Sequence, residues 1–214
     1  LGKLYLLFLP VNPVITSQTL SGSTVSITIS NPFNFAFSTD FVQVTVGGKV
    51  CTVAPGPSFT SFTCQLPTNA NGSPALPAGS YNAEVFLFKI LDTLAGAAPI
   101  DIGLAITSVG PSTGGSNGGY EITLSGNGFP SDSTLATINI CGVNAQIVSI
   151  SSTQAKIIAP PCQNTNLQDI TLSFNGKNAT TQFTYINPNV VSTIFSVSPH
   201  FTNEFSMVPP SLSP

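Results

Sequence analysis

The sequence predicts an all-β protein made of two successive β-sandwiches, with an extended strand at each end of the chain. Apolar residues recur at every second position in short runs, which is the spacing of strands with one buried face. The 214 residues include 18 Gly and 18 Pro and are rich in Ser and Thr, a composition that favours strands and turns over helices. A similar order of motifs returns after roughly 90 residues, which indicates a tandem repeat.

In the first repeat, strands are predicted at residues 14–17 and 24–30, where apolar and polar residues alternate. Valines at positions 42, 44 and 46 follow the same alternation and lead into a Gly-Gly turn at 47–48. A closing strand is predicted from 81 to 87, with its apolar residues at the odd positions.

The second repeat follows the same plan. Strands are predicted at 120–125 and 136–140, and a further strand carries Ile170, Leu172 and Phe174. Asn175-Gly176 is a strong signal for a hairpin turn, and it leads into a last strand with Phe183 and Tyr185. Seven or so short strands at this spacing are typical of a β-sandwich of immunoglobulin type.

These patterns divide the chain into four parts. They are an N-terminal strand or linker at 1–12, a first sandwich at 13–105, a second sandwich at 106–187 and a C-terminal extension at 188–214. Residues 190–199 of the extension are similar to the opening of each repeat, so the extension is expected to be the start of a further module.

The second repeat carries a series of turn and strand motifs. They are Pro111-Ser112-Thr113-Gly114-Gly115, Ile122-Thr123-Leu124-Ser125-Gly126-Asn127-Gly128-Phe129, Ile140-Cys141-Gly142, Ala159-Pro160-Pro161, Phe174-Asn175-Gly176 and Phe183-Thr184-Tyr185. Together they resemble the IPT/TIG domain, an immunoglobulin-like fold of plexins, related surface receptors and Rel-type transcription factors. The resemblance implies no catalytic residue. Gly126 and Gly128 are expected to adopt positive φ or a tight bend after their strand.

The first repeat resembles the same domain less closely. It keeps Val46-Gly47-Gly48-Lys49-Val50-Cys51, Thr63-Cys64-Gln65-Leu66-Pro67 and Leu76-Pro77-Ala78-Gly79-Ser80-Tyr81. It lacks the Gly-Gly before the second strand and the Gly-x-Gly-Phe after it.

The four cysteines form two local pairs in the sequence, Cys51 with Cys64 and Cys141 with Cys162. None shows the Cys-x-x-Cys spacing of a zinc or redox site. Three disulfide connectivities are possible, and the local one is expected because each pair falls within one repeat. Each such disulfide would stabilise the fold by about 3 kcal/mol. The alternative is four buried free thiols in a cytosolic protein.

Two Asn-x-Ser/Thr sequons, at Asn71 and Asn178, are candidates for N-linked glycosylation, and Pro74 directly after the first makes Asn71 the poorer one. Charged residues make up only 6% of the chain, against roughly 25% in ordinary soluble proteins. Glycans attached to Asn, Ser or Thr would compensate for this low charge. Sequons, cysteine pairs and low charge together favour an extracellular, secreted or cell-surface location.

Several function classes are disfavoured. The net charge is −3 and there is no arginine, so nucleic-acid binding is not expected. No stretch approaches the roughly 20 apolar residues that cross a bilayer, so membrane insertion of this segment is not expected. The single histidine, His200, has no nucleophile pattern around it, and the eight carboxylates are scattered. We expect no enzyme, no cofactor and no metal site.

Three functions are left. The first is a structural module, a repeat or subunit of a surface fibre or rod that self-associates or joins neighbouring modules. The second is a protein-binding ectodomain of a receptor or adhesion protein, and the third is a glycan-binding module.

Both ends of the chain favour the structural module, because each carries apolar residues that need cover from another module. The expected assembly residues are Leu4, Tyr5, Leu6, Leu7, Phe8, Leu9, Ile194, Phe195, Val197 and Phe201. The alternatives are that each terminus folds back on its own sandwich or belongs to a larger chain.

Overall fold

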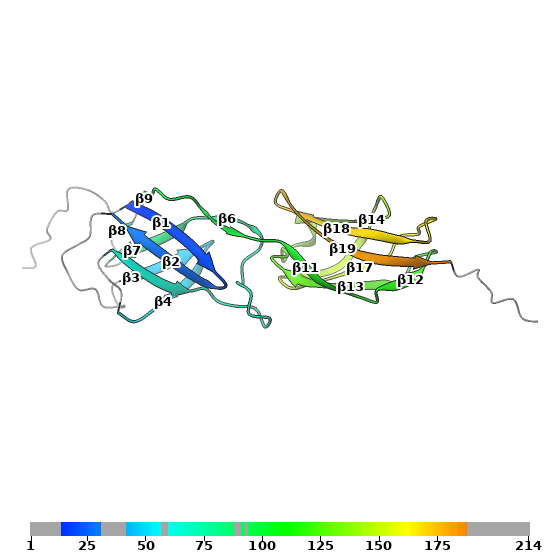
Figure 1. Cartoon of the computed structure of the whole chain (residues 1–214), viewed down its shortest axis with the longest axis horizontal. Coiled ribbons are helices and arrows are strands. Elements are labelled where there is room, and N and C mark those ends of the chain that lie inside the picture. Colours follow the sequence, from blue (N-terminus) through cyan, green and yellow to red (C-terminus); the bar gives the residue numbers. More distant parts are fainter. Residues whose placement is uncertain (1–13, 31–41, 57–59, 88–90, 93, 188–214) are drawn as a thin grey trace, which may run out of the picture.

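The computed structural model describes residues 14–30, 42–56, 60–87, 91–92 and 94–187. Their regular structure is almost entirely β-strand, so the predicted all-β class is confirmed. Two sandwiches follow one another along the long axis of the molecule (Figure 1). The predicted terminal strands, with every expected assembly residue, lie outside the described residues.

The first sandwich contains ten short strands within the described residues. In chain order they are β1 (Val14–Ser21), β2 (Thr24–Ile29), β3 (Val42–Val46), β4 (Lys49–Val53), β5 (Ser61–Gln65), β6 (Gly79–Tyr81), β7 (Ala83–Leu87), β8 (Leu91–Asp92), β9 (Leu94–Ala95) and β10 (Ile100–Ile102). Eight of them pair in the order β8-β7-β3-β4-β5-β2-β1-β9, while β10 pairs with β6. β4 joins the two layers, because it pairs with β3 at Cys51 and with β5 at Val53.

Strict alternation along the strands builds the first core, since successive side chains point to opposite faces. In β3, Val42, Val44 and Val46 are buried while Gln43 is exposed. The other buried members of this core are Ile15, Val25, Ile27, Ile29, Cys51, Phe62, Cys64, Leu66, Leu76, Ala83, Val85, Ile100 and Ile102.

The prediction of a single strand from 81 to 87 is wrong, because the chain passes from one sheet to another at Asn82. β6 pairs with β10, whereas β7 pairs with β3. Gln18 of β1, only 7% exposed, holds this break. Its amide nitrogen donates to Asn82 Oδ1 at 3.1 Å and to the Ala98 carbonyl at 2.9 Å, and its oxygen accepts from the Ala83 N–H at 2.9 Å. The break therefore depends on a buried amide from a distant strand, which alternation cannot reveal.

The second sandwich has two separate sheets. Its strands are β11 (Ala105–Gly110), β12 (Thr113–Gly115), β13 (Glu121–Asn127), β14 (Ala136–Ile140), β15 (Val143–Asn144), β16 (Gln146–Ser151), β17 (Gln154–Ile158), β18 (Leu167–Phe174) and β19 (Lys177–Ile186), with a 3₁₀ turn η2 (Ser133–Leu135). One sheet has the order β11-β13-β17-β16 and the other the order β12-β19-β18-β14-β15. Asp132 caps η2 by accepting from the Thr134 N–H at 2.9 Å.

Aromatic side chains fill the second core. Phe129, Phe183 and Tyr185 have no measurable exposure, and the last two rings meet edge to face with centroids 5.1 Å apart. The Tyr185 hydroxyl donates to the Pro160 carbonyl at 2.8 Å. Burial, with a smaller contribution from Tyr120, raises the pKa of Tyr185 to about 12. The hydroxyl therefore stays a neutral donor at physiological pH.

The predicted Asn175-Gly176 hairpin joins β18 to β19. Both residues have positive φ, 48° and 71°, which is the conformation of a type I′ turn and the reason that Asn-Gly suits it. Phe174 lies opposite Lys177 in the first pair of the ladder.

Both local cysteine pairs are joined in the structure. Cys51–Cys64 links β4 to β5, and Cys141–Cys162 links the turn after β14 to the loop after β17. The described residues contain no free cysteine.

Replacing Gln18 by Met, which keeps the length but removes the amide, leaves the buried Ala83 N–H without its partner. We expect the first sandwich to lose about 1–3 kcal/mol of unfolding free energy in urea denaturation. Thr19→Ala, at the exposed neighbour on the same strand, is the control and should change stability by no more than about 0.5 kcal/mol. Equal effects of the two substitutions would contradict the role of Gln18.

Candidate functional site

No group of three or more His, Cys, Asp or Glu side chains lies close enough to hold a metal ion in the part of the chain that the structure describes. Within the same residues, no helix has both the length and the apolar character needed to cross a bilayer. His200 lies outside the described residues.

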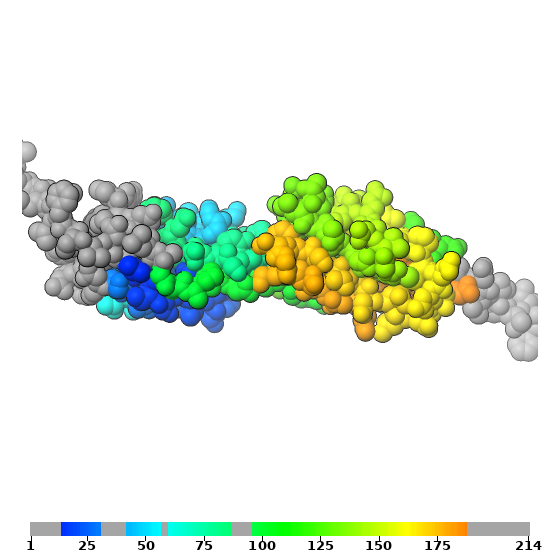
Figure 2. Space-filling model, turned by 90° about the horizontal axis from the view of Figure 1, so that it is seen from above, coloured from blue at the N-terminus to red at the C-terminus, as the bar shows by residue number. Residues whose placement is uncertain are grey.

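One group of interacting polar side chains lies between the two sandwiches. β10 ends at Ile102 and β11 begins at Ala105, so the linker is only Gly103-Leu104. Leu104 packs against the second core. A connection this short forces the facing ends of the sandwiches into contact, and their surfaces meet there without a gap in Figure 2.

A backbone hydrogen bond forms the centre of this junction. The Ala78 N–H of the first sandwich donates to the Gly128 carbonyl of the second at 2.8 Å. Gly128 has a φ of +73°, and a Cβ atom there would overlap the Gly103 carbonyl and lie 3.2 Å from the Ala78 Cβ. Glycine is therefore required twice, for its φ and for the close approach.

The expectation of positive φ is met at Gly128 but not at Gly126. A Cβ atom at Gly126 would clash with the Ala105 carbonyl and lie 2.7 Å from the Phe129 ring. Close packing, not backbone conformation, is the reason for glycine at this position.

The loop at residues 68–75, which we call the latch loop, reaches from the first sandwich to the second. Its shape is fixed internally, because Asn69 Nδ2 donates to Ser73 Oγ and to the Pro74 carbonyl, both at 3.1 Å. Asn69 Oδ1 accepts from Ser152 Oγ of the second sandwich at 2.9 Å. Asn69 therefore serves both the loop and the junction.

Asn71 is the main contact of the latch loop. Its amide nitrogen donates to Asn127 Oδ1 at 2.6 Å and to the Gly126 carbonyl at 3.3 Å, while its oxygen accepts from Ser73 at 3.1 Å and 2.7 Å. An N-linked glycan replaces one hydrogen of this nitrogen. A glycan at Asn71 would leave this nitrogen one hydrogen for its two contacts. Glycosylation at Asn71 stays a prediction.

The hairpin after β18 reaches back to the first sandwich. Asn175 Nδ2 donates to the Ala78 carbonyl at 3.2 Å, and Lys177 Nζ lies 2.6 Å and 2.8 Å from the two carboxylate oxygens of Asp101. The Lys177 hydrogen bond and charge, with a hydrogen bond from Ser80, hold the pKa of Asp101 below its usual value of 3.8. A lowered carboxyl pKa means that the ion pair is present at neutral pH and is lost only as pH falls through the lowered value.

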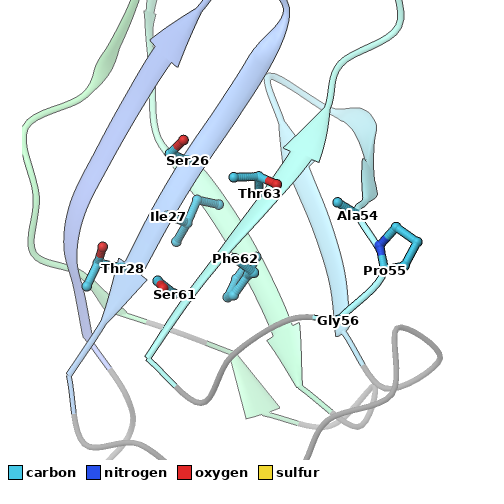
Figure 3. Close-up of a pocket in the computed structure, with 9 residues that line it drawn as sticks. All are labelled: Ser26, Ile27, Thr28, Ala54, Pro55, Gly56, Ser61, Phe62 and Thr63. Atoms are coloured by element: carbon cyan, nitrogen blue, oxygen red, sulfur yellow. The ribbon is translucent and has the colours of Figure 1, made fainter.

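Two hollows accompany these contacts. A cleft of about 240 Å³ lies at the junction itself, lined by Leu20, Gly22, Ser73, Pro74, Ile102, Gly103, Ala105, Asn127 and Gly128. An open groove of about 450 Å³ lies on the first sandwich, between residues 54–56, which follow β4, and strands β2 and β5. Figure 3 shows its hydroxyl groups, Ser26 and Thr28 from β2 and Ser61 and Thr63 from β5. None of its lining residues is charged.

The other glycosylation candidate, Asn178, is exposed on β19, opposite Ser173 of β18. Sequence reasoning missed the junction residues Asn69, Asn127, Ser152 and Asn175. Their only signal was that they lie in or beside the connections between strands of two adjacent repeats.

Residues 104–200 match the family model of the IPT/TIG domain. The second sandwich is an IPT/TIG domain. The match agrees with the two-sheet architecture and with the turn glycines described above. No curated protein matches the chain.

Solved structures that resemble the chain include other proteins with TIG or plexin domains. The TIG domain of human nuclear factor of activated T-cells, cytoplasmic 4, is 15% identical with a TM-score of 0.36, over 42% of this chain and 93% of that one. The plexin A4 extracellular region is 16% identical with a TM-score of 0.37, over 82% of this chain and 18% of that one.

A third similar structure is the Bacteroides ovatus protein SGBP-B in complex with a mixed-linkage heptasaccharide. It is 15% identical with a TM-score of 0.29, over 78% of this chain and 42% of that one. The chain spans about a fifth of the length of the first solved structures that it matches, with shares of 21%, 18% and 18%.

Substituting Gly128 by Ala tests the junction. The added methyl group meets the Gly103 carbonyl and the residue is strained at positive φ, so we expect the IPT/TIG domain to swing away from the first sandwich. Small-angle X-ray scattering should show a broader distribution of distances between the two sandwiches.

Gly48→Ala is the matched control, because Gly48 has the same φ of +73° with no atom within 4 Å of a Cβ. It should reduce stability without changing the scattering. Identical scattering of both variants and the unchanged chain would contradict the junction.

Proposed function

We propose that the chain is a non-enzymatic segment of an extracellular structural protein, a repeat or subunit of a surface fibre or rod. The observation that carries this proposal is the junction, in which two immunoglobulin-like modules touch at several points beyond their linker. Such an arrangement transmits orientation from one module to the next, which is what a spacer or rod must do.

The contacts at the junction are distributed so that they oppose rotation. The latch loop contacts Asn127 and Ser152 of the second sandwich. The two backbones are joined by the hydrogen bond from Ala78 to Gly128. Lys177 of β19 forms an ion pair with Asp101 of β10. A linker without such contacts allows domains to reorient freely. Contacts at these places, in addition to the two-residue linker, restrict how the two sandwiches can reorient.

An extracellular location is supported by chemistry. In most proteins, disulfides persist only in an oxidising compartment. This chain has two, Cys51–Cys64 and Cys141–Cys162. With 6% charged residues, the surface depends on hydroxyls and amides for solubility. N-linked glycan on the exposed Asn178 and O-linked glycan on Ser and Thr would add to it.

Assembly is proposed to occur through the two terminal segments. Residues 4–9 are an unbroken apolar run, and Ile194, Phe195, Val197 and Phe201 are apolar residues of the C-terminal segment. Burial of each large apolar side chain contributes roughly 1.5–3 kcal/mol. Strand addition to the open sheet edge of a neighbour would bury such side chains and pair their backbone groups at once.

The second candidate is a binding ectodomain, and the groove of Figure 3 is the observation that favours it. Four hydroxyl groups and no charged residue line this groove. A neutral glycan or an uncharged polar peptide is the ligand class that fits such a lining.

Deleting residues 1–10 tests the assembly role. The intact chain is expected to form oligomers or fibres in negative-stain electron microscopy, and the deleted chain is expected to stay dispersed because one linking segment is gone. Deletion of residues 1–3 alone, which leaves the apolar run in place, is the control. If the chain without residues 1–10 assembles as the intact one does, the linking role of that segment fails.

A further inference from the structure

We infer that the loop at residues 163–166, at the far end of the IPT/TIG domain, is a second latch loop that docks the next module of the same family. This inference rests on the proposed rod function and extends it, since it specifies how a third module would be attached. The partner is a domain of IPT/TIG type with a glycine turn like that at 126–128.

The two sandwiches share a strand plan that makes the two loops equivalent. The first strand of each carries a register shift at the same place, between Ile15 and Ser17 in β1 and between Ile106 and Ser108 in β11. Each pairs antiparallel with a later strand, β2 in the first sandwich and β13 in the second. That strand in turn pairs with β5 in the first sandwich and with β17 in the second. The latch loop follows β5, and the loop at 163–166 follows β17.

The two loops also carry the same residues. The first reads Asn69-Ala70-Asn71 and the second reads Asn164-Thr165-Asn166. Each Asn-x-Asn sequence comes after a disulfide-bonded cysteine and a glutamine, Cys64-Gln65 and Cys162-Gln163. Three residues separate Gln65 from Asn69, whereas Asn164 follows Gln163 directly. The asparagines that make the first junction are therefore present again.

The second loop lies where the chain leaves the domain. The Asn166 carbonyl accepts from the Tyr185 N–H at 3.3 Å, one residue before β19 ends at Ile186. Figure 1 shows β19 ending at the end of the molecule opposite the junction. The first latch loop has the same position, because Ser73 and Pro74 border one cleft with Ile102 and Gly103, where the chain leaves the first sandwich.

The second loop is available for docking. All four of its residues are exposed, and Asn166 Nδ2 donates to Asn164 Oδ1 at 3.1 Å, which holds the two amides together. Ile186 beside the loop is 53% exposed. In the first junction the equivalent asparagines contact a neighbouring module.

The sequence after this exit resembles the strand that follows the first junction. Residues 194–199 read Ile-Phe-Ser-Val-Ser-Pro and residues 106–111 read Ile-Thr-Ser-Val-Gly-Pro, with the same residue at four of six positions. The occupant proposed for the second latch loop is therefore a module that includes the sequence from Ile194 onward.

The chemistry of the first junction defines what this module must offer. Asn71 uses the Gly126 carbonyl and the Asn127 amide, and Asn69 uses the Ser152 hydroxyl. A partner with a Gly-Asn-Gly turn and a nearby hydroxyl satisfies the same groups. Because these latch groups are uncharged, their contacts should be nearly independent of salt concentration.

The experiment uses the full chain through Asn187, followed by a second copy of residues 103–187. The copy brings the linker of the first junction and its own glycine turn. Small-angle X-ray scattering should show the added copy at one fixed angle to the domain before it. The double variant Asn164→Ala, Asn166→Ala in the same fusion should broaden the angular distribution at this second junction, at low and at high salt alike.

Asn144→Ala is the matched control, since Asn144 is exposed on β15 and lies outside the loop at residues 163–166, and it should leave the scattering unchanged. Thermal unfolding of each variant verifies that the loop substitutions leave the domain folded. If the unsubstituted fusion is as flexible at the second junction as the double variant, the inference is wrong.

Asn71→Ala in the same fusion separates the two proposals. If it loosens the first junction while Asn164 and Asn166 have no effect on the second, only the second latch loop is rejected. If Asn71→Ala leaves the first junction unchanged as well, the proposed rod function fails with it.

Discussion

The close approach of two backbones at Ala78 and Gly128 is the constraint on which the arrangement of the molecule depends. Their hydrogen bond of 2.8 Å requires that nothing larger than hydrogen occupy the Gly128 side-chain position. Once these two backbone segments are this close, the latch loop and the β18–β19 hairpin each come within hydrogen-bond distance of the opposite sandwich. A two-residue linker alone would leave the sandwiches adjacent but free to rotate.

The junction explains how a chain with few charges makes a specific interface. All but one of its side-chain contacts use asparagine and serine, and only Asp101–Lys177 is ionic. Amides donate and accept at the same time, so Asn69 and Asn71 each shape their own loop and bind the neighbouring module. Among the described residues, no buried side-chain polar atom lacks a partner. Orientation is therefore fixed by satisfied neutral hydrogen bonds, which salt screens little.

The sequence predicted those features that depend on near neighbours. Alternation identified β3 and β14, the Asn175-Gly176 pair identified the last hairpin, and the motifs of residues 111–185 indicated the IPT/TIG domain. Features that join distant residues could not be predicted. The break at Asn82 depends on Gln18, and the junction pairs Asn71 with Asn127 across 56 positions without any periodicity. Asn71 shows the difficulty most clearly, since its local sequence indicates a glycosylation site and gives no sign of its contacts with Gly126 and Asn127 of the other repeat.

The central claim is that the two sandwiches move as one rigid body. Measurement of ¹⁵N relaxation across the full chain tests it directly, because it reports rotational diffusion separately for each amide. The account predicts that amides of the described residues before Gly103 and of residues 105–187 fit a single elongated diffusion tensor. Two independent tensors, each with the shorter correlation time of an isolated sandwich, would contradict it.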